Sequence, residues 1–177
     1  MEGQSCSGRT WPLAVAICVA VVGVYWFIDS RSTLWDRDEP RFSRATAEMV
    51  ESGNYLYPTF NGRLRPDKPI LIYWLMSVPM RVLGPTSLAC RFFSSVGIAL
   101  TCGLTFLLAR RFLGVPAGLW SMAILGSTLL IMMEGTLATS DGILLPCMVA
   151  VLVLFGHGLT SGRSEEHTSE LQSRYVI

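Results

Sequence analysis

Residues 34–74, LWDRDEPRFSRATAEMVESGNYLYPTFNGRLRPDKPILIYW, decide the fold, because they place two charged stretches between long apolar runs. The first charged stretch covers residues 35–41 and the second covers residues 65–69. Charged side chains next to membrane-length apolar runs are costly unless they lie outside the hydrocarbon or serve a function. The segment therefore predicts a polar unit at a membrane surface, with spanning helices on both sides of it.

The apolar runs on either side indicate an integral membrane protein. Of the 177 residues, 51% are hydrophobic and only 15% are charged, and the mean hydropathy is +0.45. Those values exceed what a soluble domain of this size normally carries. Four apolar runs are long enough to cross a bilayer as helices, at residues 11–28, 92–109, 112–133 and 142–159. The sequence predicts an all-α membrane fold with about four transmembrane helices.

Several other classes of protein are not supported by the sequence. The net charge of +1 suggests no nucleic-acid partner. The five cysteines show neither a disulfide framework nor a metal-binding spacing. The first apolar run is followed by Asp29-Ser30-Arg31-Ser32, which offers no small-x-small cleavage site, so we interpret this run as an uncleaved first span.

The loop between the first two spans, residues 29–91, predicts two short helices at the membrane interface. The first begins near Asp38 or Glu39, where a carboxylate can cap and Pro40 suits the first turn, and it ends near Gly53. One face of this helix is mostly apolar and the other is charged, as in a helix that lies in the membrane surface. The apolar face holds Phe42, Ala45, Thr46 and Met49, and the charged face holds Arg41, Arg44, Glu48 and Glu51.

The second short helix, interfacial or re-entrant, is predicted at residues 69–83. Its apolar part is only about fourteen residues long, contains Pro79 and carries Tyr73 and Trp74, which are typical of the interface. A tilted full span is the alternative, and it would change the sidedness of everything downstream. Between the two helices, Asn61-Gly62 predicts a tight turn.

The sidedness of the loop depends on which cations are counted. The loop holds nine basic residues against Arg9 alone in the N-terminal head, so a literal positive-inside count places the loop in the cytoplasm. However, the loop is long and also holds seven acidic residues, which suggests a charge-paired structure. Arg110-Arg111 form a compact basic pair in a very short loop. With that pair cytoplasmic, the charged loop faces the outside, which is the periplasm in a bacterium.

The C-terminal tail is expected not to be natural protein sequence. From residue 163 the chain reads RSEEHTSELQS, with no apolar period, and this string resembles a common sequencing adapter translated in frame. We therefore assign residues 1–162 to the membrane domain and exclude residues 163–177 from fold reasoning. A natural polar tail is the alternative, and the source DNA across codon 163 distinguishes the two.

Three charged side chains are candidates for chemistry on spacing alone. Asp38 and Arg41 are three residues apart at a helix start, and Lys68 opens the next helix. Two cations near a helix N-terminus beside a bilayer suit a phosphate headgroup, and a nearby carboxylate could act as a base or a metal ligand. Ordinary surface ion pairs are the alternative. Asp141, between two apolar runs, predicts a helix cap, a cavity-facing carboxylate, or both.

Taken together, the motifs of the chain resemble the N-terminal part of bacterial GT-C glycosyltransferases. The similarity is greatest to the aminoarabinose transferases of lipid A and to their protein-mannosyltransferase-like relatives in glycosyltransferase family 39. It covers nearly all of residues 13–159. The motifs that carry it are DEPRF (38–42), NG (61–62), DKPILIYW (67–74), RF (91–92), LLARRFLG (107–114) and ATSD (138–141).

The resemblance implies a bacterial inner-membrane enzyme that moves a sugar from a polyprenyl phosphate to a lipid, glycan or protein acceptor on the periplasmic side. It implies that Asp38 is the catalytic base or orients the acceptor, and that Asp141 is the second acidic residue of the site. Arg41 and Lys68 would hold the carrier phosphate. Glu39 and Asp67 are candidates for contact with the acceptor or with a divalent metal.

The chain departs from the family pattern at two positions. Phe42 stands where the family often has Tyr, and Asp67 stands where it usually has Glu, so metal ligation at residue 67 would use a shorter side chain. Family members also have more spans, so a fragment of this length is expected to be inactive by itself. The alternative function is a non-catalytic membrane subunit or a transporter that uses the charged loop as a gate.

Overall fold

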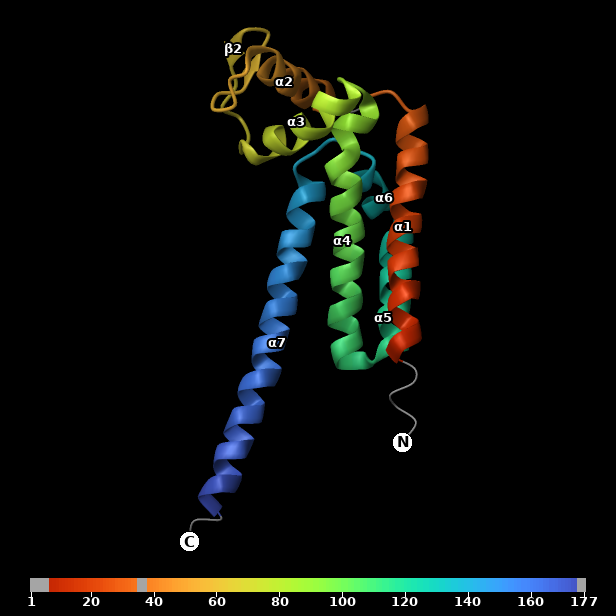
Figure 1. Cartoon of the computed structure of the whole chain (residues 1–177), viewed down its shortest axis with the longest axis vertical. Coiled ribbons are helices and arrows are strands. Elements are labelled where there is room, and N and C mark those ends of the chain that lie inside the picture. The colour runs from red at the N-terminus through yellow and green to blue at the C-terminus, as the bar shows by residue number, and fades with distance from the viewer. Residues whose placement is uncertain (1–6, 35–37, 175–177) are drawn as a thin grey trace.

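The chain folds into a bundle of long helices with a cap of shorter elements at one end (Figure 1). The computed structural model describes residues 7–34 and 38–174, so residues 35–37 of the first charged stretch lie outside it. The elements are α1 (Ser7–Arg31), α2 (Glu39–Ser52), β1 (Thr59–Phe60), β2 (Arg63–Leu64), α3 (Leu71–Leu83), α4 (Ser87–Leu113), α5 (Val115–Ser127), α6 (Leu129–Gly135) and α7 (Asp141–Arg174). The cap consists of α2, the β1–β2 hairpin and α3.

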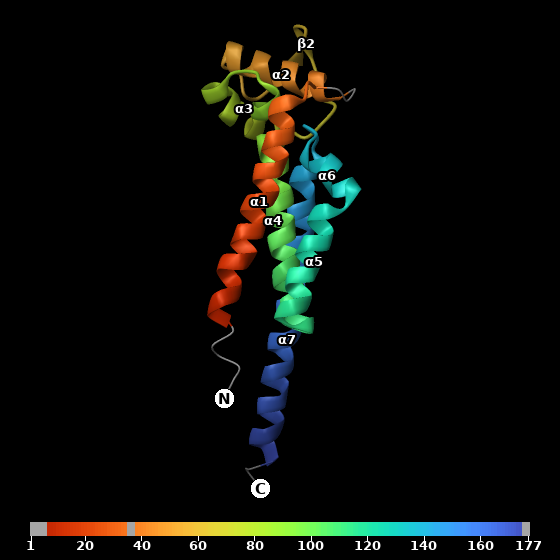
Figure 2. The same ribbon diagram turned by 90° about the vertical axis from the view of Figure 1, so that its right-hand side faces the viewer.

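The predicted all-α membrane fold with about four spans is confirmed, whereas two of the predicted spans differ in their course or bounds. Within the described residues, three helices are long and apolar enough to cross a membrane, at Trp11–Arg31, Ser87–Leu113 and Asp141–Leu159. The central helix is α4, which packs against α1, α5 and α7 (Figures 1 and 2). Residues 163–174 continue α7, and the expectation that they derive from an adapter stays a prediction about the source DNA.

The third predicted span, residues 112–133, is wrong as a continuous helix. It is divided into α5 and α6, whose axes differ by 68° at Thr128. The hydroxyls of Ser127 and Thr128 both donate to the carbonyl of Ile124, at 3.0 and 2.8 Å, and so compete with helix propagation. The Tyr25 hydroxyl donates to the carbonyl of Gly126 at 3.0 Å, which satisfies an acceptor at the break.

The start of α4 also differs from the prediction. The helix begins at Ser87, where the Thr86 side chain accepts a 3.2 Å hydrogen bond from the Ala89 N–H, rather than at residue 92. A charge at Arg91 marked the expected boundary, but that guanidinium is fully buried inside the helix–cap junction. Paired and buried, the charge does not end the helix.

The two short helices of the loop are present and pack on one another, and their position at the membrane interface stays a prediction. Phe42, Ala45 and Met49 of α2 are buried with Tyr73 and Met76 of α3 in one core, which extends to α4. The apolar face of α2 is therefore covered by protein, which explains its amphipathic pattern. Helix α2 ends at Gly53, whose left-handed backbone (φ 71°) lets its N–H donate to the Met49 carbonyl at 3.1 Å. Helix α3 is about 20 Å long, less than the hydrocarbon thickness of about 30 Å.

The predicted turn at Asn61-Gly62 is confirmed and closes a two-stranded hairpin. Both residues have positive φ, 52° and 73°, as the hairpin turn with two left-handed positions requires. The strands have two residues each, too few for a sequence period to be visible. The Glu48 carboxylate holds the hairpin to α2, because it accepts from the Thr59 hydroxyl at 2.7 Å and from the Asn61 N–H at 2.8 Å.

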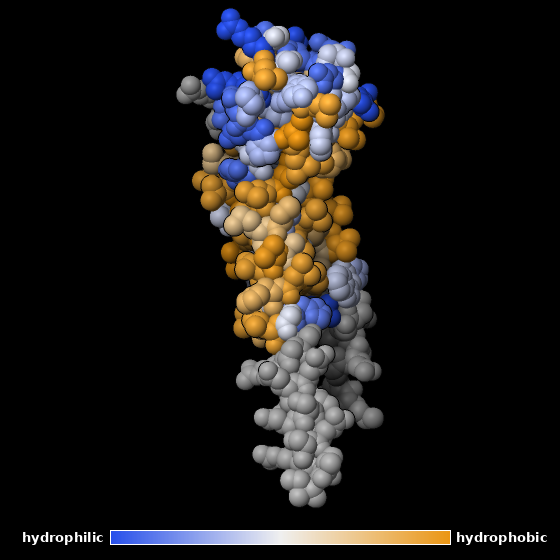
Figure 3. Space-filling view, turned by 90° about the vertical axis from the view of Figure 1, so that its left-hand side faces the viewer, coloured by the Kyte–Doolittle hydropathy of each residue, from blue (hydrophilic) through white to orange (hydrophobic). Residues whose placement is uncertain are grey.

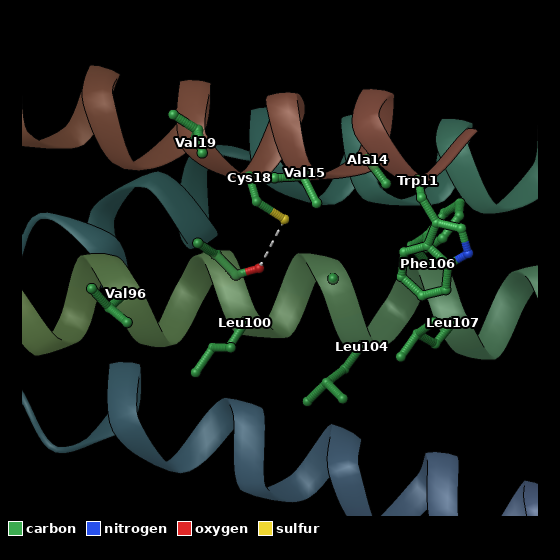
Figure 4. A pocket seen from close by; sticks show the side chains of 12 residues that line it. Trp11, Ala14, Val15, Cys18, Val19, Val96, Leu100, Leu104, Phe106 and Leu107 are labelled. Atoms are coloured by element: carbon green, nitrogen blue, oxygen red, sulfur yellow. Dashed lines mark hydrogen bonds between the residues drawn. The ribbon is translucent and has the colours of Figure 1, made fainter. Parts of the chain in front are cut away.

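The surface of the molecule follows the same division. A hydrophobic belt covers the bundle and a mainly hydrophilic surface covers the cap, as Figure 3 shows. Within the belt, α1 and α4 enclose an apolar pocket of about 360 Å³ (Figure 4). Trp11 and Phe106 lie at one end of it, and the Cys18 thiol donates to the Ala99 carbonyl at 3.5 Å near its middle.

Candidate active site

Asp38 and Arg41 lie together at the start of α2, as their spacing predicts. Arg41 Nη1 lies 3.3 Å from Asp38 Oδ1, and the two side chains are 41% and 45% exposed. The Asp38 side chain makes no capping hydrogen bond, so the cap predicted for it is absent, although its carbonyl accepts from the Phe42 N–H at 3.0 Å. The pair forms a half-exposed corner in which a carboxylate and a guanidinium are both accessible.

Asp67 and Lys68 lie in a bend just before α3, and both are exposed. Lys68 has no hydrogen bond or ion pair to another residue of the described part of the chain. Arg65 connects this bend to α2, because its guanidinium lies 5.6 Å from the centre of the Phe42 ring and its Nε lies 3.5 Å from Asp67 Oδ2. The second charged stretch therefore packs against α2 next to the end of the first stretch, at Phe42.

Arg65 is a residue that sequence reasoning missed. It is buried, with 9% of its surface exposed, and it lies over the rings of both Phe42 and Phe60 at 5.6 Å. Its Nε and the neighbouring Tyr73 hydroxyl are buried and have no hydrogen-bond partner among the described residues. The sequence does place Arg65 in a loop that also contains aromatic residues such as Phe60, and an arginine in that setting can pack by cation–π contact.

An apolar pocket of about 220 Å³ lies between the start of α3 and the start of α7. It is lined by Pro69, Leu71 and Ile72 on one side and by Ser140, Ile143, Leu144 and Cys147 on the other. Lys68 directly precedes Pro69 in the chain, and Asp141 directly follows Ser140, but neither Lys68 nor Asp141 lines the pocket itself. Two of the predicted site residues are therefore next in sequence to residues that line one apolar pocket.

Asp141 is the first residue of α7 and is exposed, so its carboxylate lies in the first turn, where the helix dipole favours negative charge. It accepts a 3.3 Å hydrogen bond from the Ser140 hydroxyl. The backbone next to it is fixed by close packing, because a Cβ on Gly97 of α4 would lie 2.1 Å from the Gly142 carbonyl oxygen. The contact between α4 and α7 thus sets the position of Asp141.

Arg91, Asp29 and Glu39 form a buried charged cluster, which we call the Arg91 cluster. Arg91 Nε and Nη2 donate to the two oxygens of Glu39 at 2.7 and 2.8 Å, and Arg91 Nη1 donates to Asp29 Oδ1 at 3.3 Å. All three side chains are at most 1% exposed. The sequence shows Asp29 and Arg91 at the ends of apolar runs and Glu39 within the first charged stretch, but pairing across 52 and 62 residues is not visible in it.

Glu39 thus has a structural role that differs from the acceptor or metal contact expected of it. Besides Arg91, its Oε1 accepts the N–H of Ala138 at 2.8 Å. Among residues 7–34 and 38–174, no group of three or more His, Cys, Asp or Glu side chains is arranged to hold a metal ion. The described side chains therefore do not by themselves form a metal site.

Comparisons with known proteins find relatives over most of the chain. Residues 67–167, more than half of the chain, match the family described as dolichyl-phosphate-mannose-protein mannosyltransferase. A curated relative from Sodalis glossinidius, undecaprenyl phosphate-alpha-4-amino-4-deoxy-L-arabinose arabinosyl transferase 2, is 30% identical over 82% of this chain and 27% of its own length. The chain thus spans about a quarter of that relative.

Two solved structures share the fold. The crystal structure of ArnT from Cupriavidus metallidurans in the apo state has a TM-score of 0.73 and 24% identity, over 85% of this chain and 28% of ArnT. The structure of the same protein bound to undecaprenyl phosphate has a TM-score of 0.68 and 26% identity, over 80% of this chain and 26% of ArnT. The membrane helices and the cap are therefore a known arrangement.

Proposed function

Because the chain belongs to the dolichyl-phosphate-mannose-protein mannosyltransferase family, we propose that it is part of a glycosyltransferase that uses a lipid-linked sugar. The donor is a sugar on a polyprenyl phosphate, and the acceptor is a lipid, a glycan or a protein. The proposal is supported above all by the accessible pair of Asp38 and Arg41 in the cap, with the exposed Lys68 and Asp141 each next in sequence to a residue that lines one apolar pocket.

The cations suit the leaving group of such a reaction. In the proposed reaction, an acceptor hydroxyl oxygen attacks the anomeric carbon and the bond from that carbon to the phosphate oxygen breaks. The polyprenyl phosphate leaves with the bonding electrons as an anion. Arg41 and Lys68 stabilise that anion by fixed positive charge and charge-assisted hydrogen bonds. The pocket beside Lys68 takes the first part of the polyprenyl chain, since its lining is mainly apolar.

The carboxylates suit the proton transfer. Asp38 takes the proton of the acceptor hydroxyl as general base, and its contact with Arg41 keeps it next to the carrier phosphate. Asp141 is the second acidic residue, and it orients the acceptor or the sugar. The substrates approach from the extracytoplasmic face, the periplasm in a bacterium, and residues 29–91 face that side of the inner membrane.

Substitution of Asp38 by Asn tests the proton-transfer role. The assay uses membranes that contain the product of the complete genomic reading frame, with undecaprenyl-phosphate-linked aminoarabinose as donor and lipid A as acceptor. We expect transfer to fall by roughly 100-fold or more, as loss of a general base does. Glu51→Gln is the control, since Glu51 is an exposed carboxylate on the same helix. Full transfer by Asp38→Asn would contradict this role.

Substitution of Lys68 by Ala tests the phosphate role separately. We expect binding of undecaprenyl phosphate to weaken by roughly 10- to 150-fold, because a charge-assisted hydrogen bond contributes roughly 1.5–3 kcal/mol. Arg63→Ala, which removes another exposed cation from the same loop, is the control. If binding of undecaprenyl phosphate is unchanged in Lys68→Ala, Lys68 does not hold the phosphate. If the parent protein neither binds undecaprenyl phosphate nor transfers the sugar, a non-catalytic subunit or a transporter is favoured.

A further inference from the structure

The start of α2 is tied to the segment before α7 by a buried arginine and a buried glutamate. We propose that Arg91 and Glu39 are positioning residues that hold Asp38 and Asp141 in a single site. The proposal rests on the function proposed above for those two aspartates. It assigns a role in the reaction to two side chains that cannot touch a substrate, since both are fully buried.

The link passes through one carboxylate oxygen. Glu39 Oε1 accepts the Arg91 Nε–H at 2.7 Å and the Ala138 N–H at 2.8 Å, so it joins α4 to the segment between α6 and α7. Glu39 directly follows Asp38 in the chain, and Ala138 lies three residues before Asp141. A shift of either partner would therefore move one of the two aspartates relative to the other.

The guanidinium itself is held on its other side. Arg91 Nη2 donates to the Thr33 carbonyl at 3.0 Å, and Nη1 contacts both the Asp29 carboxylate and the Ser32 hydroxyl. Arg91 is thereby fixed to the end of α1 as well as to α2. Five donor contacts from a buried planar group leave it little freedom to rotate, so the position of Glu39 is well determined.

The same arrangement predicts that Glu39 can lose its charge without unfolding the protein. Asp29 remains as a counter-charge for Arg91 in Glu39→Gln, so the cation is not left unpaired in the interior. Gln has nearly the volume of Glu and keeps one carbonyl oxygen. The single side-chain oxygen of Gln cannot accept all the hydrogen bonds from Arg91 Nε, Arg91 Nη2 and the Ala138 N–H that the two Glu39 oxygens accept. The link therefore loosens while the core stays filled.

The loss should affect turnover rather than donor binding. Asp38 and Arg41 contact each other within one helix, three residues apart, so their pair does not depend on the Arg91 cluster. Lys68 lies in the bend before α3, which packs on α2 through an apolar core that includes Phe42 and Met49 but not Glu39. The phosphate-binding cations therefore stay in place when the link to residue 138 is weakened, whereas Asp141 moves relative to Asp38.

The test compares Glu39→Gln with the same substitution at the exposed Glu51, in the complete gene product. We expect kcat for sugar transfer from undecaprenyl-phosphate-linked aminoarabinose to fall by roughly 10- to 100-fold, as small misplacements of reacting groups do. The KM for that donor and the binding of undecaprenyl phosphate should stay within about twofold of the parent. Glu51→Gln should match the parent in all three measurements. An unchanged kcat in Glu39→Gln would overturn the proposal, as would an equal loss of undecaprenyl phosphate binding.

A distance measurement tests the link without any activity. Spin labels are placed on Ser52→Cys at the end of α2 and on the exposed native Cys147 of α7, in a background with Cys6 and Cys18 replaced by Ala. Glu39→Gln should broaden or shift the distance distribution, and Glu51→Gln should not. An unchanged distance distribution in Glu39→Gln would overturn the link. This outcome is separate from a failure of the proposed function, which would appear as full transfer by Asp38→Asn.

Discussion

At the scale of single residues, Glu48 holds the hairpin of the cap to α2. Its carboxylate accepts from the Thr59 hydroxyl, from the N–H groups of Asn61 and Gly62, and from Arg44 Nε at 3.1 Å. The Thr59 hydrogen bond is the largest cause that lowers the pKa of Glu48 below its ordinary value of 4.5. The charged form is thus favoured in the folded protein.

This makes the contribution of Glu48 to stability dependent on pH. A carboxylate whose pKa is lowered by folding contributes fully above its unfolded pKa, near 4.5, and the contribution disappears as the pH falls through the folded pKa. We expect Glu48→Gln to have a lower Tm than the parent at pH 7 and the difference to shrink below pH 4.5. Thermal unfolding in detergent between pH 7 and pH 3 measures it, with Glu51→Gln as the control. A Tm difference that does not change with pH would contradict the prediction.

Other residues show where sequence reasoning ends. Asp38 and Arg41 were predictable as a pair because a helix brings residues three apart together. The contacts of Arg91 with Glu39 and Asp29 were not, because they depend on how α1, α2 and α4 meet. By themselves, Asp29 and Arg91 indicate only the ends of apolar runs, and Glu39 indicates only a charged stretch.

At the scale of elements, close contact between α4 and α7 places the start of α7. Gly97 of α4 faces the backbone of Gly142, and an added Cβ would lie 2.1 Å from its carbonyl oxygen. The obstacle is backbone, so it cannot move aside as a flexible side chain would. The two helices would have to separate, and Asp141 would move with α7.

Gly97→Ala should therefore destabilise the protein by about 1–3 kcal/mol, the usual cost of overpacking. Gly23→Ala in α1 is the matched control, because a Cβ there meets nothing within 4 Å. The control should gain up to about 1 kcal/mol, since Ala replaces Gly inside a helix. Unfolding in detergent measures both free energies. Equal stabilities for the two variants would contradict the close contact.

The elements also differ in how far the sequence predicted them. Uninterrupted apolar runs predicted α1 and α7, and the amphipathic pattern predicted α2. The break at Thr128 was missed because every residue from 112 to 133 is uncharged, so hydropathy gives no signal there. The break depends instead on hydroxyl groups that bond back to Ile124 and on the distant Tyr25.

At the scale of the whole molecule, α4 is the interior helix and α1 and α7 are peripheral. Of an apolar stretch of 18 residues in each span, 44% is buried in α4, against 11% in both α1 and α7. The outer faces of α1 and α7 are consequently available to lipid or to further helices. The cap, by contrast, has its own core between α2, α3 and α4. The cap therefore keeps its internal geometry whatever covers the outer faces.

Because α4 crosses the membrane, the cap and the end of α4 lie on opposite sides of it. Leu56 in the cap is 70% exposed, and Leu113 at the end of α4 is 74% exposed, so the two leucines form a matched pair for labelling. The Arg110-Arg111 pair in the last turn of α4 favours a cytoplasmic location for that end. In spheroplasts, with Cys6 and Cys147 replaced by Ser, a membrane-impermeant maleimide should label Leu56→Cys at once and Leu113→Cys only after permeabilisation. The reverse pattern would place the cap in the cytoplasm, where a periplasmic sugar donor could not reach Asp38 and Lys68.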